Sequence, residues 1–226
     1  MILLGSAVNA AAIIVCGIIG SFLKKGLPKR FGDLVIAALG FFTLMLGVNF
    51  AMKTEYPLVV IFSLVIGAGL GEWIDIEKRM DNIGNMVQDR LKGFKGDFSK
   101  GFVTASLLFV VGSMAIMGSL QSGLTNDHQT LYTKAVMDGV ISIVFASTMG
   151  IGVAASALPV FIYQGTIALL AAFLQPYLST AVVLEMTAVG GILLMGVGCN
   201  ILEIKRVRVG NLIPAIFLPI LIMMFI

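Results

Sequence analysis

Apolar residues in this chain form long runs that short polar segments separate. A run of about 20 apolar residues is long enough to cross a hydrocarbon core of about 30 Å as one α-helix. The pattern therefore predicts an all-α fold, a polytopic bundle of about eight transmembrane helices. The expected spans are residues 2–23, 34–52, 57–74, 101–120, 135–157, 159–180, 182–204 and 212–226.

Three of these spans are less regular than the others. Only a turn near Leu158 and Pro159 separates the fifth span from the sixth. The eighth holds Pro214 and Pro219 in about 15 residues, and at 1.5 Å per residue it covers about 22 Å. Seven spans remain if this last helix does not cross the membrane.

Residues 75–100 form the longest polar segment, in which an apolar residue recurs every three or four positions. This spacing predicts an amphipathic α-helix. Three interpretations stay open: a helix lying on the inner face of the membrane, a stripe for self-association, or a regulatory element that senses a ligand.

The composition supports a membrane protein. Hydrophobic residues make up 58% of the 226 residues and charged residues 12%, which leaves too few charges to cover a soluble globule. The lipid bilayer is the expected partner, and the net charge of +3 is no sign of nucleic-acid binding. The apolar run from Ile2 lacks the basic start of a signal peptide, so we expect it to remain as the first helix.

The basic residues predict the orientation of the chain. Of the 15 Lys and Arg residues, 13 fall between alternate pairs of spans, whereas Lys53 and Lys134 fall in the other loops. Because loops rich in Lys and Arg stay in the cytoplasm, we expect residues 24–33, 75–100 and 205–211 on the cytoplasmic side of the membrane and both termini on the outer side.

A similarity about 128 residues apart predicts an internal repeat. Residues 67–79 and 196–206 share alternate glycines, then an acidic residue beside isoleucine, then two basic residues. The single transmembrane domain, residues 1–226, would then consist of two parallel repeats, 1–120 and 130–226, of four helices each. Chance similarity between two glycine-rich helix ends is the alternative.

Ionisable and amide side chains inside apolar spans are the candidate site, because such groups are costly in lipid. Asp138 and Glu185 lie about one turn inside the outer ends of their predicted spans, at similar depth. They predict an outer site that attracts a cation, or merely positions among lipid headgroups. Asn9, Gln164 and Ser142 are added as candidates for the ion or solute site.

Residues on the fifth predicted span and at the inner helix ends extend this list. Asp138, Ser142, Gly152 and Ser156 share a stripe, which suits either a water-lined path or close packing. The glycines and proline of residues 148–159 favour a locally unwound helix or tight packing. Glu72, Asn200 and Glu203 form a candidate polar cluster at the inner ends, with Lys78 and Arg206 as alternative ion-pair partners.

Motifs for catalysis, nucleotides and metals are absent from the sequence. His128 is the only histidine, and no HExxH, GxSxG or P-loop pattern occurs. Cys16 and Cys199 lie in apolar runs and form neither a disulfide framework nor a Cys/His cluster. We therefore expect no catalytic residues, no cofactor and no metal, with a carboxylate-based intramembrane enzyme as a third, weaker hypothesis.

Several segments resemble one known family, the DUF554 family of bacterial membrane proteins. The resemblance covers essentially the whole chain and includes the sequence Gly67-Ala-Gly-Leu-Gly-Glu72. It implies a multi-pass protein of the bacterial inner membrane. The only function that the resemblance suggests is transport, and it assigns no site residue in this chain. The similar segments are residues 2–9, 24–28, 67–72, 146–153, 156–159, 197–202 and 208–214.

These patterns together predict a transporter or channel for a small solute or cation, assembled as a homo-oligomer. Asp138 and Glu185 would attract the cation, and Asn9 and Gln164 would bond the solute. Active transport would be ion-coupled, because the sequence holds no domain for ATP hydrolysis. A membrane scaffold or accessory subunit that transports nothing is the alternative.

Overall fold

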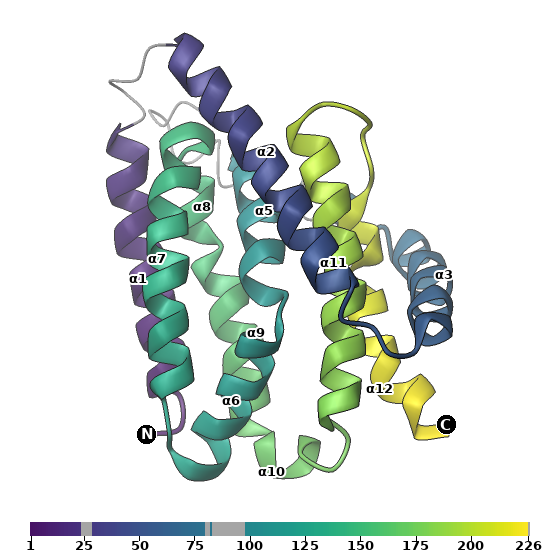
Figure 1. The fold of residues 1–226 in the computed structure, drawn as a ribbon. Coiled ribbons are helices and arrows are strands. Elements are labelled where there is room, and N and C mark those ends of the chain that lie inside the picture. Colours follow the sequence, from purple (N-terminus) through teal and green to yellow (C-terminus); the bar gives the residue numbers. More distant parts are fainter. Residues whose placement is uncertain (24–28, 80–81, 83–97, 226) are drawn as a thin grey trace. The chain divides into compact units, whose positions relative to one another are not determined.

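The computed structural model describes residues 1–23, 29–79, 82 and 98–225, and every regular element in these residues is a helix (Figure 1). The predicted all-α fold is thereby confirmed. The α-helices are α1 (Leu4–Leu23), α2 (Lys29–Ala51), α3 (Pro57–Ile74), α5 (Phe98–Val110), α6 (Ser113–Thr125), α7 (Gln129–Met149), α8 (Gly152–Ala155), α9 (Ala157–Leu169), α10 (Ala171–Leu174), α11 (Thr180–Ile201) and α12 (Leu218–Ile222). Two 3₁₀ helices, η2 (Val209–Phe217) and η3 (Met223–Phe225), flank α12.

Six helices among the described residues are long and apolar enough to cross a membrane, with α8 and α9 counted as one. A seventh results if α5 and α6, which meet at a bend of 64°, form one span. The last predicted span is shorter, because Pro214 lies inside η2 and Pro219 near the start of α12. Proline lacks the N–H that a continuous helix needs. If α5 and α6 form one span, the total of seven spans equals the number expected without the last helix.

The predicted boundary between the fifth and sixth spans is wrong. Helix α7 ends at Met149, and Gly150 follows with φ = 91°, a conformation that glycine adopts without a steric penalty. Pro159 lies in the first turn of α9, where a missing N–H breaks no helical hydrogen bond. Gly152 and Ser156 therefore lie beyond α7, and the predicted stripe on one helix ends at Ser142.

The chain divides into two compact units. This division differs from the predicted halves 1–120 and 130–226, and the internal repeat stays a prediction. Unit 1 holds α1, α5, α7 to α10 and most of α6, whereas unit 2 holds most of α2, then α3, α11, η2 and α12. By residues, unit 1 is Met1–Val35, Asp81–Val110 and Met114–Leu174, and unit 2 is Ile36–Met80, Val111–Ser113 and Gln175–Ile226.

In unit 1, α1 and α7 pack side by side and run in the same direction (Figure 1). Gly5 faces Leu131 near the start of both helices, and Gly20 faces Ile143 near their ends. A Cβ at position 20 would lie 2.3 Å from the Ile143 carbonyl oxygen. Small residues thus let the two backbones approach closely, as is typical of helices packed in a membrane.

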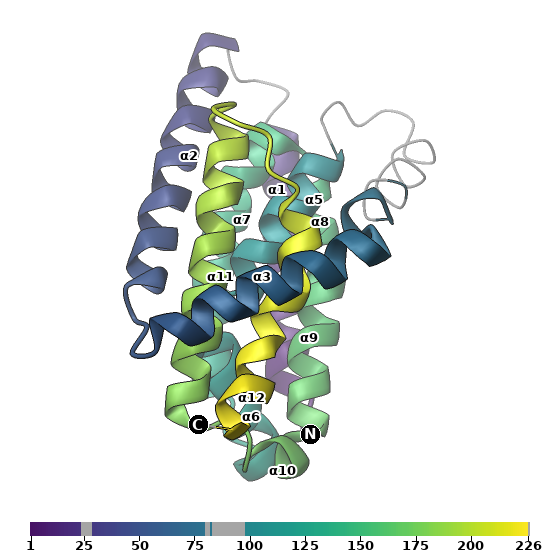
Figure 2. The same ribbon diagram turned by 90° about the vertical axis from the view of Figure 1, so that its right-hand side faces the viewer.

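In unit 2, α2 packs antiparallel to α11, and α3 crosses η2 (Figure 2). Gly40 faces Leu202 and Gly47 faces Gly191, whereas Gly71 faces Asn211. Figure 2 shows α3 crossing α11 and the C-terminal segment. Within each unit, these directions agree with spans that alternate in direction along the chain.

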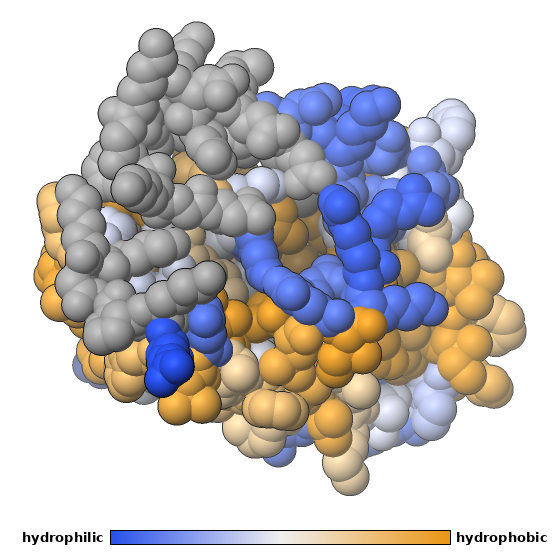
Figure 3. Space-filling view, turned by 90° about the horizontal axis from the view of Figure 1, so that it is seen from above, coloured by the Kyte–Doolittle hydropathy of each residue, from blue (hydrophilic) through white to orange (hydrophobic). Residues whose placement is uncertain are grey.

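The surface carries both apolar and hydrophilic regions. Figure 3 shows hydrophilic residues gathered on the face seen end-on and hydrophobic residues beside them. Large apolar side chains such as Leu58, Val65 and Trp73 are exposed on the outside of α3, where lipid would cover them. The predicted amphipathic helix over residues 75–100 falls mainly on residues 80–81 and 83–97, which lie outside the described residues.

Candidate functional site

Asp138 lies near the middle of α7 and only 3% of its surface is exposed. The prediction that it lies about one turn inside the helix end is wrong. The reason is that α7 begins at Gln129, ahead of the predicted start at residue 135. A carboxyl group therefore lies well inside an apolar helix, where it needs a partner.

The partner of Asp138 is Lys134, one helical turn earlier and 7% exposed. The Lys134 Nζ lies 2.9 Å from both carboxylate oxygens. The placement of Lys134 in an outer loop is therefore wrong, and Lys134 is a site residue that the sequence analysis missed. Its spacing of four from Asp138 was the available signal, because residues i and i+4 share a helix face. The opposite charges offset each other and reduce the cost of burying either one.

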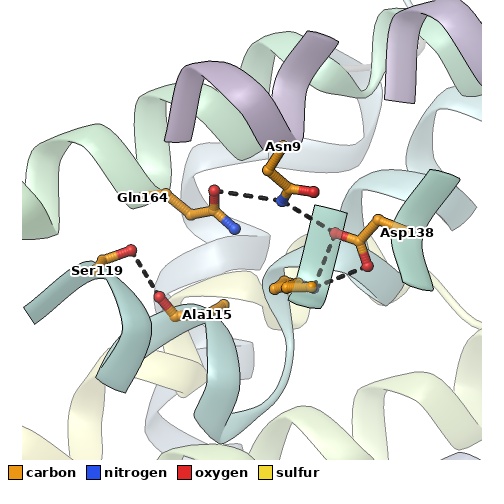
Figure 4. A network of polar contacts seen from close by, with 6 residues as sticks. Asn9, Ala115, Ser119, Asp138 and Gln164 are labelled. Carbon is orange, nitrogen blue, oxygen red and sulfur yellow. Dashed lines mark hydrogen bonds and ion pairs between the residues drawn. The ribbon is translucent and has the colours of Figure 1, made fainter. Parts of the chain in front are cut away.

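Asn9 joins this ion pair to α9. Its Nδ2 donates hydrogen bonds to Asp138 Oδ2 at 3.0 Å and to Gln164 Oε1 at 3.3 Å (Figure 4). Asn9 and Gln164 are both fully buried. The structure thus brings together three of the predicted ion or solute residues, from α1, α7 and α9.

We name this group the α1–α7–α9 cluster. Ser142 follows Asp138 by one turn on α7, and Ser6 precedes Asn9 by three residues on α1, so each lies on the polar face of its helix. Both serines are fully buried. The cluster consists of Ser6, Asn9, Lys134, Asp138, Ser142 and Gln164.

Four polar atoms of the cluster have no hydrogen-bond partner among the described residues: Asn9 Oδ1, Gln164 Nε2, Ser6 Oγ and Ser142 Oγ. Ser119, which is equally buried, instead donates to the Ala115 carbonyl in its own helix (Figure 4). An unsatisfied buried polar group costs about 1–3 kcal/mol. Four such atoms on three neighbouring helices are the arrangement expected of a site that receives water or a polar solute.

Glu185, in unit 2, has a different role. It is fully buried in α11, close to the predicted distance of about one turn from the start of the helix at Thr180. Its carboxylate accepts hydrogen bonds from the Thr54 hydroxyl at 2.5 Å and from the backbone N–H groups of Glu55 and Tyr56 at 2.7 and 3.0 Å. Glu185 therefore holds the connection between α2 and α3 and caps the N-terminal end of α3.

Glu72 and Asn200 of the predicted inner-end cluster each bind a different structural partner. Glu72 pairs with Arg208 at 2.6 Å, where Lys78 was the predicted partner, and accepts a hydrogen bond from Asn211 at 2.8 Å. Asn200 instead bonds both the N–H and the carbonyl of Val207, which closes the loop after α11. Glu203 follows the end of α11 with φ = 57°.

The contacts of Asn211 and Glu77 extend the Glu72 pair into a latch between α3 and η2. Asn211 Oδ1 accepts from the Glu77 N–H, and Glu77 Oε2 accepts from the Gly210 N–H, both at 2.7 Å. We call Glu72, Glu77, Arg208, Gly210 and Asn211 the α3–η2 latch.

In the part of the chain that the structure describes, no group of three or more His, Cys, Asp or Glu side chains could hold a metal ion. The α1–α7–α9 cluster contributes a single carboxylate, two amides, two hydroxyls and one ammonium group. Its chemistry is hydrogen bonding around a neutral ion pair.

The chain is similar to known proteins along nearly its whole length. The family described as "Protein of unknown function (DUF554)" matches residues 4–224. The uncharacterized membrane protein YdfK of Bacillus subtilis (strain 168) is 38% identical over 219 residues, which cover 95% of this chain and 93% of YdfK. The uncharacterized protein YqgA of Escherichia coli (strain K12) is 29% identical over 220 residues, 95% of this chain and 94% of YqgA. No solved structure matches.

Proposed function

This chain belongs to the DUF554 family, and we propose that it is an inner-membrane transporter or channel for a small polar solute or cation. The resemblance noted in the sequence is thereby confirmed. The chain is a membrane protein: it has long apolar helices, and its relative YdfK is described as a membrane protein. The observation that carries the transport proposal is the α1–α7–α9 cluster, in which buried polar atoms stay open inside apolar helices.

In unit 2, three of the predicted site residues are already engaged in structural contacts. Every oxygen of Glu185 accepts a hydrogen bond from the connection between α2 and α3, so its carboxylate is committed to structure. Glu72 and Asn200 are likewise engaged with Arg208 and Val207. Among the candidate residues, those of the α1–α7–α9 cluster keep unused hydrogen-bonding capacity.

The proposed protein has its basic loops in the cytoplasm and assembles from several copies. The excess of Lys and Arg in residues 24–33, 75–100 and 205–211 supports a cytoplasmic side for these loops and an outer side for both termini. With Lys134 inside α7, Lys53 alone is left on the outer side, which strengthens the bias. We propose a homo-oligomer and no enzymatic role.

A scaffold is the second candidate, and the close glycine contacts between α1 and α7 favour it, because a scaffold needs only tight packing. The two functions differ in whether water reaches the cluster. A transporter must expose its site to water in at least one state, whereas a packed scaffold need not.

Thiol labelling tests this difference. In a chain whose Cys16 and Cys199 are replaced by alanine, Ser142→Cys is expected to react at least about tenfold faster than Ser119→Cys with a small water-soluble thiol reagent, a difference of about 1.4 kcal/mol. Ser119 is the matched control, because it is equally buried but satisfied within its helix. Equal rates at the two positions would favour the scaffold.

A further inference from the structure

We infer that the α1–α7–α9 cluster takes a small uncharged solute that carries a hydrogen-bond donor beside an acceptor, as an amide or urea does. This inference rests on the proposed transport function and names its substrate class. It follows from two features of the cluster, its charge and the pattern of its open atoms.

The charge of the cluster disfavours a cation. The Lys134 ammonium contacts both oxygens of Asp138 at 2.9 Å, so the carboxylate is already neutralised. A cation arriving at Asp138 would meet the positive charge of Lys134 or would have to displace it. Displacement would leave a buried ammonium without its partner, which is strongly unfavourable.

The orientation of the Asn9 amide is determined by its neighbours. Its Nδ2 faces two oxygen atoms, Asp138 Oδ2 and Gln164 Oε1. The reversed orientation would place the Asn9 oxygen against both of these acceptors and lose both hydrogen bonds. Asn9 Oδ1 is therefore the open acceptor.

Gln164 supplies the complementary donor. Its Oε1 accepts from Asn9, and its Nε2 keeps its N–H groups without a partner among the described residues. The open acceptor and the open donor belong to two amides that are already bonded to each other (Figure 4). The hydroxyls of Ser6 and Ser142 can each donate or accept and add adaptable contacts.

A solute can satisfy both amides only if it donates to Asn9 Oδ1 and accepts from Gln164 Nε2. A metal cation offers no acceptor to Gln164, and a carboxylate anion offers no donor to Asn9. The edge of a primary amide or of urea offers both groups. A site that hydrogen-bonds its ligand strongly rejects analogues that leave a buried group unpaired.

The test measures four probes in sealed vesicles that contain the purified full chain. Acetamide and urea are followed by vesicle swelling, and sodium and potassium ions by uptake. We expect acetamide and urea to cross faster than in protein-free vesicles and the two cations to cross at the protein-free rate. Gln164→Leu should reduce the protein-dependent flux of acetamide about tenfold, whereas Ser119→Ala should leave it unchanged.

A second measurement does not depend on how well the Gln164→Leu variant folds. Acetamide should slow the labelling of Ser142→Cys in the otherwise wild-type cluster, and sodium chloride at the same concentration should not. Protection by acetamide supports the inference, and equal labelling rates with and without acetamide contradict it.

The outcomes separate the inference from the proposed function. If sodium or potassium crosses and its flux depends on Gln164 while acetamide and urea do not cross, transport stands and the uncharged-solute inference is overturned. If acetamide crosses equally fast with Gln164→Leu and Ser119→Ala, the cluster is not its site. If none of the four probes crosses faster than in protein-free vesicles and acetamide does not protect Ser142→Cys, the proposed transport of these solutes fails together with the inference.

Discussion

Replacing Asp138 by alanine is expected to lower the free energy of unfolding by about 3–5 kcal/mol, because it leaves the buried Lys134 ammonium without its partner. Lys134→Met should be similarly costly, since the carboxylate then stays buried with Asn9 as its remaining donor. The measurement is unfolding of the purified chain in mixed micelles by titration with a denaturing detergent.

The double variant separates the ion pair from simple loss of packing. Lys134→Met combined with Asp138→Leu should lose only about 1–2 kcal/mol, the cost of the Asn9 N–H that loses its acceptor. Ser119→Ala is the matched control for a buried polar group outside the cluster. Losses of the two single variants that simply add in the double variant would show that Lys134 and Asp138 are not coupled.

Gly71→Ala is expected to be the most damaging glycine substitution in unit 2, with a loss of about 3 kcal/mol or more. A Cβ at this position would lie 1.7 Å from the Asn211 carbonyl oxygen, which is backbone and cannot move aside. To make room, α3 and η2 must separate, and this strains the bonds of Asn211 to Glu72 and Glu77 in the α3–η2 latch.

Gly69→Ala, on the same helix, is the matched control for Gly71→Ala. Nothing lies within 4 Å of a Cβ at position 69, so this variant should unfold at the wild-type detergent concentration or slightly above it. Equal stability of the Gly71→Ala and Gly69→Ala variants would contradict the close contact between α3 and η2.

The bounds of several helices could be predicted from the hydrophobic runs, because polar loops mark the ends of these helices. The predicted spans 2–23 and 57–74 compare with Leu4–Leu23 and Pro57–Ile74 in the structure. The fifth and sixth spans were misplaced, because residues 148–159 hold Gly150, Gly152 and Pro159, and their composition does not decide which of these ends the helix. The turn depends on the backbone conformation of Gly150, which hydropathy does not report.

The candidate site was predicted in part for similar reasons. Asn9, Asp138 and Gln164 were recognisable as polar side chains within apolar runs, and the structure brings them into contact. Lys134 was missed, because the start of its helix was placed too late and the residue was counted as part of a loop. Glu185 was assigned to cation attraction, because sequence cannot show that the backbone of Glu55 and Tyr56 meets its carboxylate.

Transport through the α1–α7–α9 cluster is decided by solute flux through the variant that combines Lys134→Met with Asp138→Leu. This variant should fold, yet it lacks the ion pair that orients Asn9 in the cluster. Reconstituted in sealed vesicles, it is expected to pass acetamide at the protein-free rate while the wild-type chain passes it faster. If the folded double variant passes acetamide as fast as the wild-type chain, acetamide does not cross through the α1–α7–α9 cluster.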